Sequence, residues 1–66
     1  MTKKDYEQLV ASLRSCREKI ECRYKDSEEF ATMYYMFNMV VAHVEDALVL
    51  NNPKFDEHLF RKAVYK

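Results

Sequence analysis

The chain has 66 residues, and 48% of them are hydrophobic, which is enough to build a core and too much for a disordered protein. Eleven basic side chains balance eleven acidic ones, so no net charge attracts nucleic acid or an anionic membrane to the whole molecule. The chain has no glycine and one proline, which argues against turn-rich β folds because hairpins depend on glycine for positive φ angles. We therefore expect one all-α domain over residues 1–66.

The first predicted helix begins after Thr2 and ends at about Tyr24. The Thr2 hydroxyl can cap the free amides of the first turn, and Asp5 lies three residues later, where an acidic side chain is favourable. The polar faces carry pairs at i,i+4 spacing, such as Arg17 with Glu21. The apolar residues repeat with the 3-4 spacing of a helix that packs lengthwise against one partner helix. They are Tyr6, Leu9, Leu13, Cys16 and Ile20.

A second long helix is predicted from the break at residues 24–27 to about Leu50. Asp26 with Glu29 resembles a capping box, and Ser27 is the alternative cap. One face complements the first helix with Phe30, Met33, Phe37, Val40, Val44, Ala47 and Leu48. A weaker apolar stripe, which two polar residues interrupt, lies on the opposite side with Ala31, Tyr35, Met39, Ala42 and Val49. This helix therefore has two faces to cover.

A short third helix follows the turn at residues 51–54. Pro53 ends the second helix, because the residue before a proline is pushed out of the α region. Asp56 is the expected N-cap of a helix over about residues 57–65, and Phe55 and Phe60 take the two positions of a hydrophobic staple. The residues offered to the core are Leu59, Phe60, Ala63 and Val64.

The predicted fold is a helical hairpin of two long helices with a short third helix. The third helix, about 13 Å long against about 36 Å for the second, cannot cover the whole second stripe. The chain is also shorter than the roughly 70–80 residues at which one core comfortably supports a domain. We expect a partner to cover the remaining stripe. An antiparallel homodimer through the second helix is the first candidate, because two-fold dimers dominate soluble oligomers, and a different protein is the second.

The reactive residues form no pattern that is typical of an enzyme, a metal centre or a cofactor site. His43 and His58 fall on different helices and lack the spacing of metal ligands. Cys16 falls in the packing seam and Cys22 on a solvated face, too far apart for a disulfide. Free thiols indicate a reducing compartment, and the chain begins without the apolar segment of a signal peptide. We expect a cytoplasmic protein that is not an enzyme, has no cofactor and does not contact membranes.

The zero net charge hides an uneven distribution along the chain. Residues 1–25 carry seven basic and four acidic side chains, residues 26–53 carry no basic and five acidic ones, and residues 54–66 carry four and two. Neutralisation between packed helices is the simpler explanation. One alternative is an acidic second helix that imitates nucleic acid to a host protein. The other is a basic surface for phosphates, such as nucleic-acid binding by a helix-turn-helix-like pair made of the second and third helices, although the turn lacks the usual glycine. Its candidate contacts are Lys54, His58, Arg61, Lys62 and Lys66.

The centre of the second helix is rich in tyrosine and methionine, and these side chains cannot all face the first helix. Thioethers beside tyrosine rings are typical of adaptable binding surfaces, whereas core filling or burial in a dimer are the structural explanations. The neighbouring acids suit either the rim of an interface or a solvated patch. The candidate interface residues are Tyr34, Tyr35, Met36, Met39, Glu45, Asp46 and Val49.

Residues 1–6 (MTKKDY) and the segments VEDAL, NNPKFD and Phe60 within residues 44–60 resemble parts of short open reading frames common in bacteriophage and prophage genomes. Those frames open with a Thr-basic-x-Asp-Tyr helix and close with Ala-Leu, Asn-Pro-basic-Phe-Asp and a final Phe. The centre at residues 32–39 and the last four residues depart from that pattern. The frames have no assigned activity, so the resemblance implies a phage-like origin and carries no functional residue over.

A small helical protein of such origin is expected to bind and redirect a host machine. We expect it to modulate or inhibit a defence nuclease complex such as CRISPR-Cas, or RNA polymerase, by protein–protein contact in the host cytoplasm. An anti-CRISPR or host-takeover protein would act in this way. The alternative function is a small DNA-binding regulator that uses the helix-turn-helix-like pair.

Overall fold

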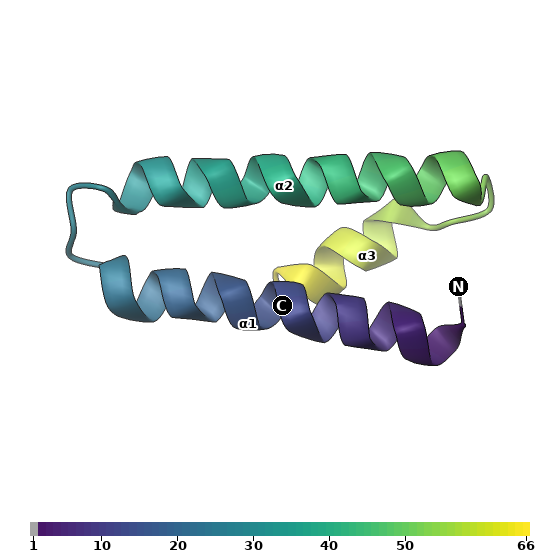
Figure 1. Ribbon diagram of the computed structural model, residues 1–66, viewed down its shortest axis with the longest axis horizontal. Coiled ribbons are helices and arrows are strands. Elements are labelled where there is room, and N and C mark those ends of the chain that lie inside the picture. The colour runs from purple at the N-terminus through teal and green to yellow at the C-terminus, as the bar shows by residue number, and fades with distance from the viewer. Residues whose placement is uncertain (1) are drawn as a thin grey trace.

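A computed structural model describes residues 2–66 and contains three helices in this range: α1 (Lys3–Tyr24), α2 (Phe30–Asn51) and α3 (Glu57–Val64). The two long helices, of 22 residues each, run antiparallel as a hairpin, and α3 crosses one side of it (Figure 1). The predicted all-α hairpin with a short third helix is confirmed. The molecule is elongated, with extents of 39 × 19 × 14 Å. None of the three described helices combines the length with the hydropathy of a membrane-spanning segment.

Helix α1 begins with a reciprocal capping box. The backbone N–H of Asp5 donates to the Thr2 hydroxyl at 3.1 Å, and the N–H of Thr2 donates to the Asp5 carboxylate at 3.2 Å. Two of the four free amides of the first turn are thereby satisfied. The predicted start of this helix is therefore confirmed, and Asp5 contributes a hydrogen bond in addition to its charge.

Helix α2 begins later than its sequence suggests. Its N-cap is Glu29, which makes no capping side-chain hydrogen bond, so the predicted capping box of Asp26 and Glu29 is wrong. The hydroxyl of Ser27 instead accepts from the N–H of Glu29 at 3.1 Å, inside the turn that precedes the helix. The N–H of Phe30 donates to the carbonyl of Ser27, and this closes the tight turn between α1 and α2. The turn residues therefore bond to one another and leave the helix start without a side-chain cap.

Helix α3 begins as predicted. One carboxylate oxygen of Asp56 accepts from the N–H groups of His58 at 3.0 Å and Leu59 at 3.1 Å. The rings of Phe55 and Phe60 lie with their centroids 5.6 Å apart, which is the hydrophobic staple. This staple directs α3 back across the hairpin, where Phe60 is fully buried.

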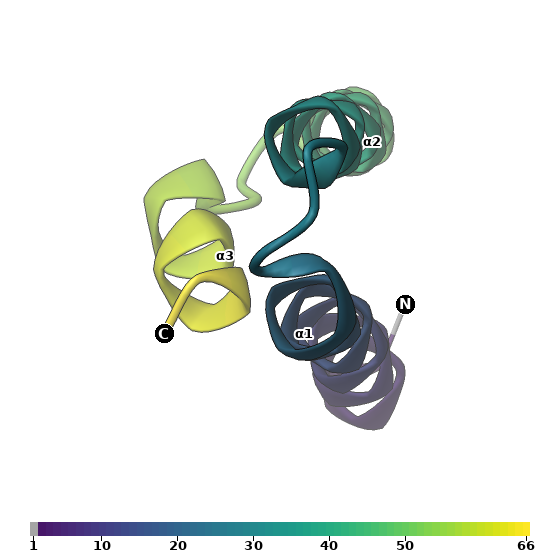
Figure 2. The ribbon, with the colours of Figure 1, turned by 90° about the vertical axis from the view of Figure 1, so that its left-hand side faces the viewer.

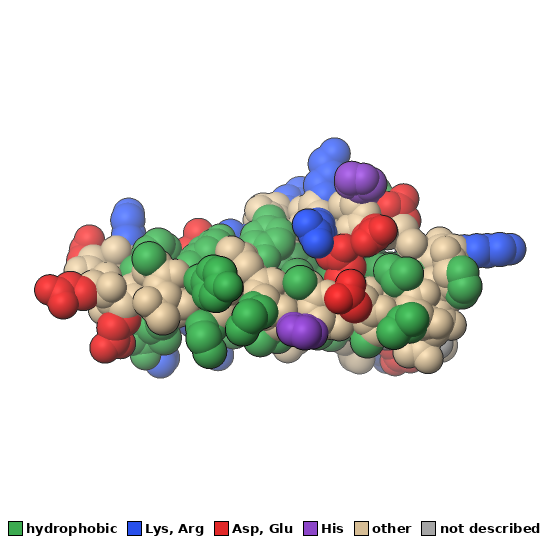
Figure 3. All heavy atoms as spheres, turned by 90° about the horizontal axis from the view of Figure 1, so that it is seen from above, with side chains coloured by type: hydrophobic (Ala, Val, Ile, Leu, Met, Phe, Trp, Pro, Cys, Tyr) green, Lys and Arg blue, Asp and Glu red, His purple; other side chains and the backbone are tan. Residues whose placement is uncertain are grey.

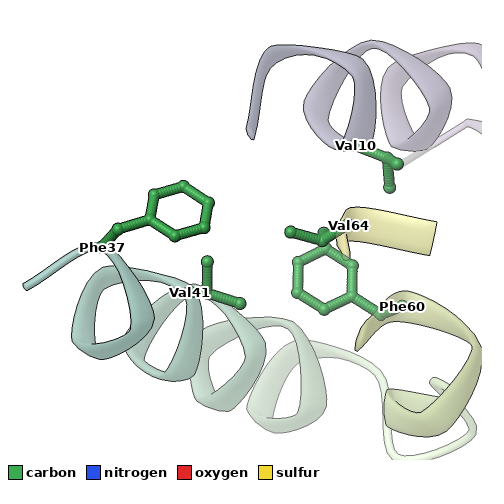
Figure 4. Packing of buried hydrophobic residues seen from close by; sticks show 5 residues of the cluster. All are labelled: Val10, Phe37, Val41, Phe60 and Val64. Carbon is green, nitrogen blue, oxygen red and sulfur yellow. The ribbon is translucent and has the colours of Figure 1, made fainter. Parts of the chain in front are cut away.

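The core contains five buried hydrophobic side chains drawn from all three helices (Figure 4). They are Val10, Phe37, Val41, Phe60 and Val64. Because α3 packs on one side of the hairpin, it shifts the buried arc of each long helix towards itself. Val41 is therefore buried, whereas Val40, which its spacing assigned to the core, is 53% exposed. For the same reason Val10 is buried and Cys16 is exposed, contrary to the predicted seam.

The predicted inward position of Leu59 is also wrong. Its side chain is 60% exposed, since Phe60 and Val64 occupy the space between the long helices. Ala47, which was assigned to the face towards α1, is exposed as well. An eight-residue helix that crosses two others can turn only a narrow stripe inward.

Candidate protein-binding surface

Helix α3 covers only one side of the hairpin, and α2 is left with a wide uncovered surface. Viewed along the hairpin, α3 lies on one side of the pair of long helices, and no other described element lies on the opposite side (Figure 2). The side of α2 that meets α3 contributes four residues to a hollow shared with Arg61 and Tyr65; they are Tyr34, Asn38, Val41 and Ala42. The remaining surface of α2 divides into two parts.

The first part is named the outer stripe and lies on the side of α2 away from α1, with Ala42 at its border with the hollow next to α3. It consists of Ala31, Tyr35, Met39, Ala42, Asp46 and Val49. Tyr35 is 67% exposed and Met39 is 43% exposed, although both are large side chains with apolar surface. Seen from above, hydrophobic side chains gather along α2 between charged side chains at the α1–α2 turn and a second charged group next to α3 (Figure 3). The predicted binding residues Tyr35 and Met39 therefore share an accessible, largely apolar strip.

The second part borders a groove between α1 and α2, on the side away from α3. The groove has a volume of about 480 Å³ and an apolar lining of Leu13, Cys16, Ile20, Thr32, Met33, Met36, Phe37 and Val40. Met36 is 53% exposed at its edge. The sequence did not predict this groove, because Val40 and Met33 were expected to be covered by α1.

Tyr34 and Glu45 do not belong to the free surface that the sequence suggested. The ring of Tyr34 packs against Phe30 and Phe37, with centroids 5.6 and 6.2 Å away, and its side chain is half-buried. Glu45 is 2% exposed, so its expected place on an interface rim or a solvated patch is wrong. Asp46 is exposed and Val49 is half-buried. Of the two neighbouring acids, only Asp46 is therefore available to a partner.

The reason for the burial of Glu45 is an ion pair with α3. Its carboxylate accepts a hydrogen bond from Nε of Arg61 at 2.5 Å. This hydrogen bond lowers the pKa of Glu45, against the opposing effect of burial. The neighbouring carboxylate of Glu45 raises the pKa of Glu57, and the bond to Glu45 raises the pKa of Arg61. Glu45 is therefore ionised and holds α3 against α2.

This ion pair also involves one of the predicted nucleic-acid contacts. Arg61 is engaged by Glu45, while Lys54 lies in the α2–α3 turn and Lys62 and Lys66 lie at the far end of α3. His58 is exposed near the start of α3. Acidic residues 56 and 57 occupy the N-terminal end of α3, where a recognition helix contacts bases. The structure thus gathers Arg61, Lys62 and Lys66 at the C-terminal end of α3 and places negative charge at its N-terminal end.

The described residues contain no group of three histidine, cysteine or acidic side chains that could hold a metal ion. Cys16 and Cys22 are both free and exposed. No family model, curated protein or solved structure matches this chain.

Proposed function

We propose that this chain is a binding protein that modulates or inhibits a host macromolecular machine through the outer stripe of α2. The observation that carries this proposal is the exposure of Tyr35 and Met39, at 67% and 43%, on a helix whose opposite side is buried. Contiguous apolar surface on a small folded chain marks an interaction site. Tyrosine and methionine are also enriched at protein interfaces.

The geometry of the outer stripe suits recognition of a helix by a groove on the partner. The apolar positions 31, 35, 39, 42 and 49 follow each other at the spacing of one helix face. Asp46 adds one negative charge within that face. A partner with a hydrophobic groove and a basic residue near one end would match this pattern.

The resemblance to short phage reading frames supports the choice of a host machine as partner. Candidates are a defence nuclease complex such as CRISPR-Cas, and RNA polymerase. The DNA-binding alternative has less support, because Arg61 is paired with Glu45 and acidic residues occupy the N-terminal end of α3. A regulator that reads bases would present its basic residues at that end.

Binding to purified machines tests the proposal. Wild-type protein and the double variant Tyr35→Ala with Met39→Ala would be titrated against RNA polymerase and against CRISPR-Cas effector complexes, with their enzymatic activities measured in parallel. We expect one machine to be bound and its activity changed, and the double variant to bind at least about 30-fold more weakly, as for an interface hot spot. Lys62→Ala, an exposed change on α3, is the matched control and should bind normally.

Two results would contradict the proposal. One is that the double variant, with unchanged helix content, binds as tightly as the wild type. The other is that no machine is bound, while a DNA duplex is bound with steep salt dependence that the double change of Arg61 and Lys62 to alanine removes. The second result would establish the alternative function.

A further inference from the structure

We infer that a second copy of this chain docks on the groove side of α2 and completes an antiparallel four-helix assembly. The observations are the pattern of exposed residues bordering the groove, the excess of exposed area and the position of α3. They concern a surface separate from the outer stripe, so this inference goes beyond the proposed function.

The groove side of α2 carries a second seam with regular spacing, in which one member is half-buried and five are exposed. Three members line the groove, and the other three continue the same helix face beyond it. The members of the seam follow each other at intervals of three and four residues, which is the repeat of helices that pack lengthwise. They are Met33, Met36, Val40, His43, Ala47 and Leu50, called the groove seam below. Val40 and Met36 are each 53% exposed and Leu50 is 83% exposed. A helix in a single folded monomer does not ordinarily present such a seam to water.

The groove seam is self-complementary when α2 meets an antiparallel copy of itself. With the two-fold axis between residues 41 and 42, Val40 faces the partner's His43, Met36 faces the partner's Ala47, and Met33 faces the partner's Leu50. Met36 then meets a small residue, and Met33 meets an apolar side chain in the last turn of the partner's α2. Every member of the seam has a partner, which is the property that a two-fold interface requires.

The chain exposes more surface than a monomer of its mass ordinarily does, and the excess is close to the area that one partner buries in such an interface. A monomer of 8.0 kDa is expected to expose about 4,450 Å², whereas this chain exposes 5349 Å². The excess of about 900 Å² is close to the roughly 800 Å² that each partner buries in a standard interface. The flat, elongated shape accounts for the excess, and pairing two hairpins face to face would remove it.

Helix α3 does not block the groove side of α2 from a second copy of the chain. Helix α3 packs on the side of α2 that carries Val41 and Glu45, away from the groove seam. The end-on view shows the opposite side of the hairpin free of any described element (Figure 2). A second hairpin can therefore lie across the groove without displacing α3, and the outer stripes of both copies stay accessible.

The solution mass across a concentration series tests the inference. We expect the reduced protein to reach twice its mass of 8.0 kDa. Val40→Glu, at the centre of the groove seam, should return it to the monomer mass while far-ultraviolet circular dichroism still shows helix. Tyr35→Glu, on the outer stripe of the same helix, is the matched control and should remain a dimer. A wild-type chain that stays monomeric up to about 0.5 mM would overturn the inference.

Cross-linking tests the antiparallel register. In a background with Cys16 and Cys22 changed to serine, the double variant Met36→Cys with Ala47→Cys should form a covalent dimer on oxidation, and Ala47→Cys alone should not. Efficient cross-linking of Ala47→Cys alone would mean parallel helices and would overturn the register. The two proposals fail separately, because Val40→Glu tests the dimer and the double change of Tyr35 and Met39 to alanine tests host binding.

Discussion

Arg17 in α1 donates a hydrogen bond through Nε to the carbonyl oxygen of Val64 at the end of α3, over a distance of 3.1 Å. A second nitrogen of the same guanidinium donates to the carbonyl of Lys66 at 2.7 Å, and the third nitrogen donates a hydrogen bond to the carboxylate of Glu21. The carbonyls at the end of a helix lack partners within the helix and carry partial negative charge. Arg17 therefore caps α3 from a different helix.

Removing this cap should loosen α3. Arg17→Ala is expected to lower the free energy of unfolding by about 2 kcal/mol, because two hydrogen bonds from a charged and largely buried donor are lost. Arg17→Lys should recover only part of the loss, since an ammonium cannot reproduce the guanidinium fork. Urea unfolding followed by circular dichroism gives the values. Lys19→Ala on the exposed face of α1 is the control, and an equal loss there would contradict the capping role.

The Glu45–Arg61 pair predicts how stability responds to acid. The pKa of Glu45 is lower in the folded chain, so its contribution is present above about pH 4.5 and is lost as the pH falls through the lower folded pKa. The pKa of Glu57 is raised, so its contribution has the opposite sign and is lost as the pH rises through the folded pKa. Glu45→Gln should therefore flatten the acid loss of stability, and Glu57→Gln should steepen it.

Urea unfolding at a series of pH values between 3 and 7 would measure both responses. Asp46→Asn, an exposed neutralisation beside Glu45, is the control and should follow the wild-type curve. If Glu45→Gln loses stability in acid as steeply as the wild type does, the pair is not responsible for the response.

Replacing Asp56 should destabilise the chain, whereas the same replacement at Asp26, the mispredicted cap of α2, should have no effect. Asp56→Ala removes the acceptor for two amides of α3 and should cost about 1 kcal/mol, or about 4–8 °C in the melting temperature. Asp26→Ala removes a carboxylate that caps nothing in the turn, so the melting temperature should stay unchanged. Thermal unfolding of both variants is the measurement. A comparable fall for Asp26→Ala would show that this residue does cap α2.

Adjacent valines in α2 should differ in what they stabilise. Val41→Ala removes two buried carbon atoms from the core and should cost about 2 kcal/mol at any protein concentration. Val40→Ala should cost less than about 0.5 kcal/mol in dilute protein, because the side chain is 53% exposed. Its cost should grow with concentration if the groove seam is shared between copies. Unfolding at two concentrations separates these cases, and equal losses in dilute protein would contradict the burial difference.

The helices themselves and two of their starts could be predicted because they depend on short-range chemistry. Thr2 and Asp56 form caps with amides two or three residues away, and Phe55 meets Phe60 five residues away. The hairpin could be predicted as well, because the first and second helices carry apolar repeats of similar length. The cap of α2 was mispredicted, although it is also local, because the turn residues satisfied one another instead.

The candidate site was predicted only in part. The exposed positions of Tyr35 and Met39 followed from α2 having more apolar faces than the chain can cover. The groove was missed, since the repeat of the second helix does not tell which edge of its inward face α1 will cover. Glu45 was misplaced because the sequence does not tell on which side of α2 the third helix packs. Glu45 and Asp46 are the only charged side chains of α2, and a charge inside an apolar helix is the signal that could have indicated a distant partner such as Arg61.

The sequence by itself determined three amphipathic helices, their order and the caps of α1 and α3, because these depend on contacts within one or two turns of helix. Only the tertiary structure decided which of Val40 and Val41 is buried, since the side on which α3 packs selects the buried arc of α2. It also decided that Arg17 caps a helix 47 residues away. Helical periodicity restricts the direction of a side chain, but it holds no information about what lies in that direction.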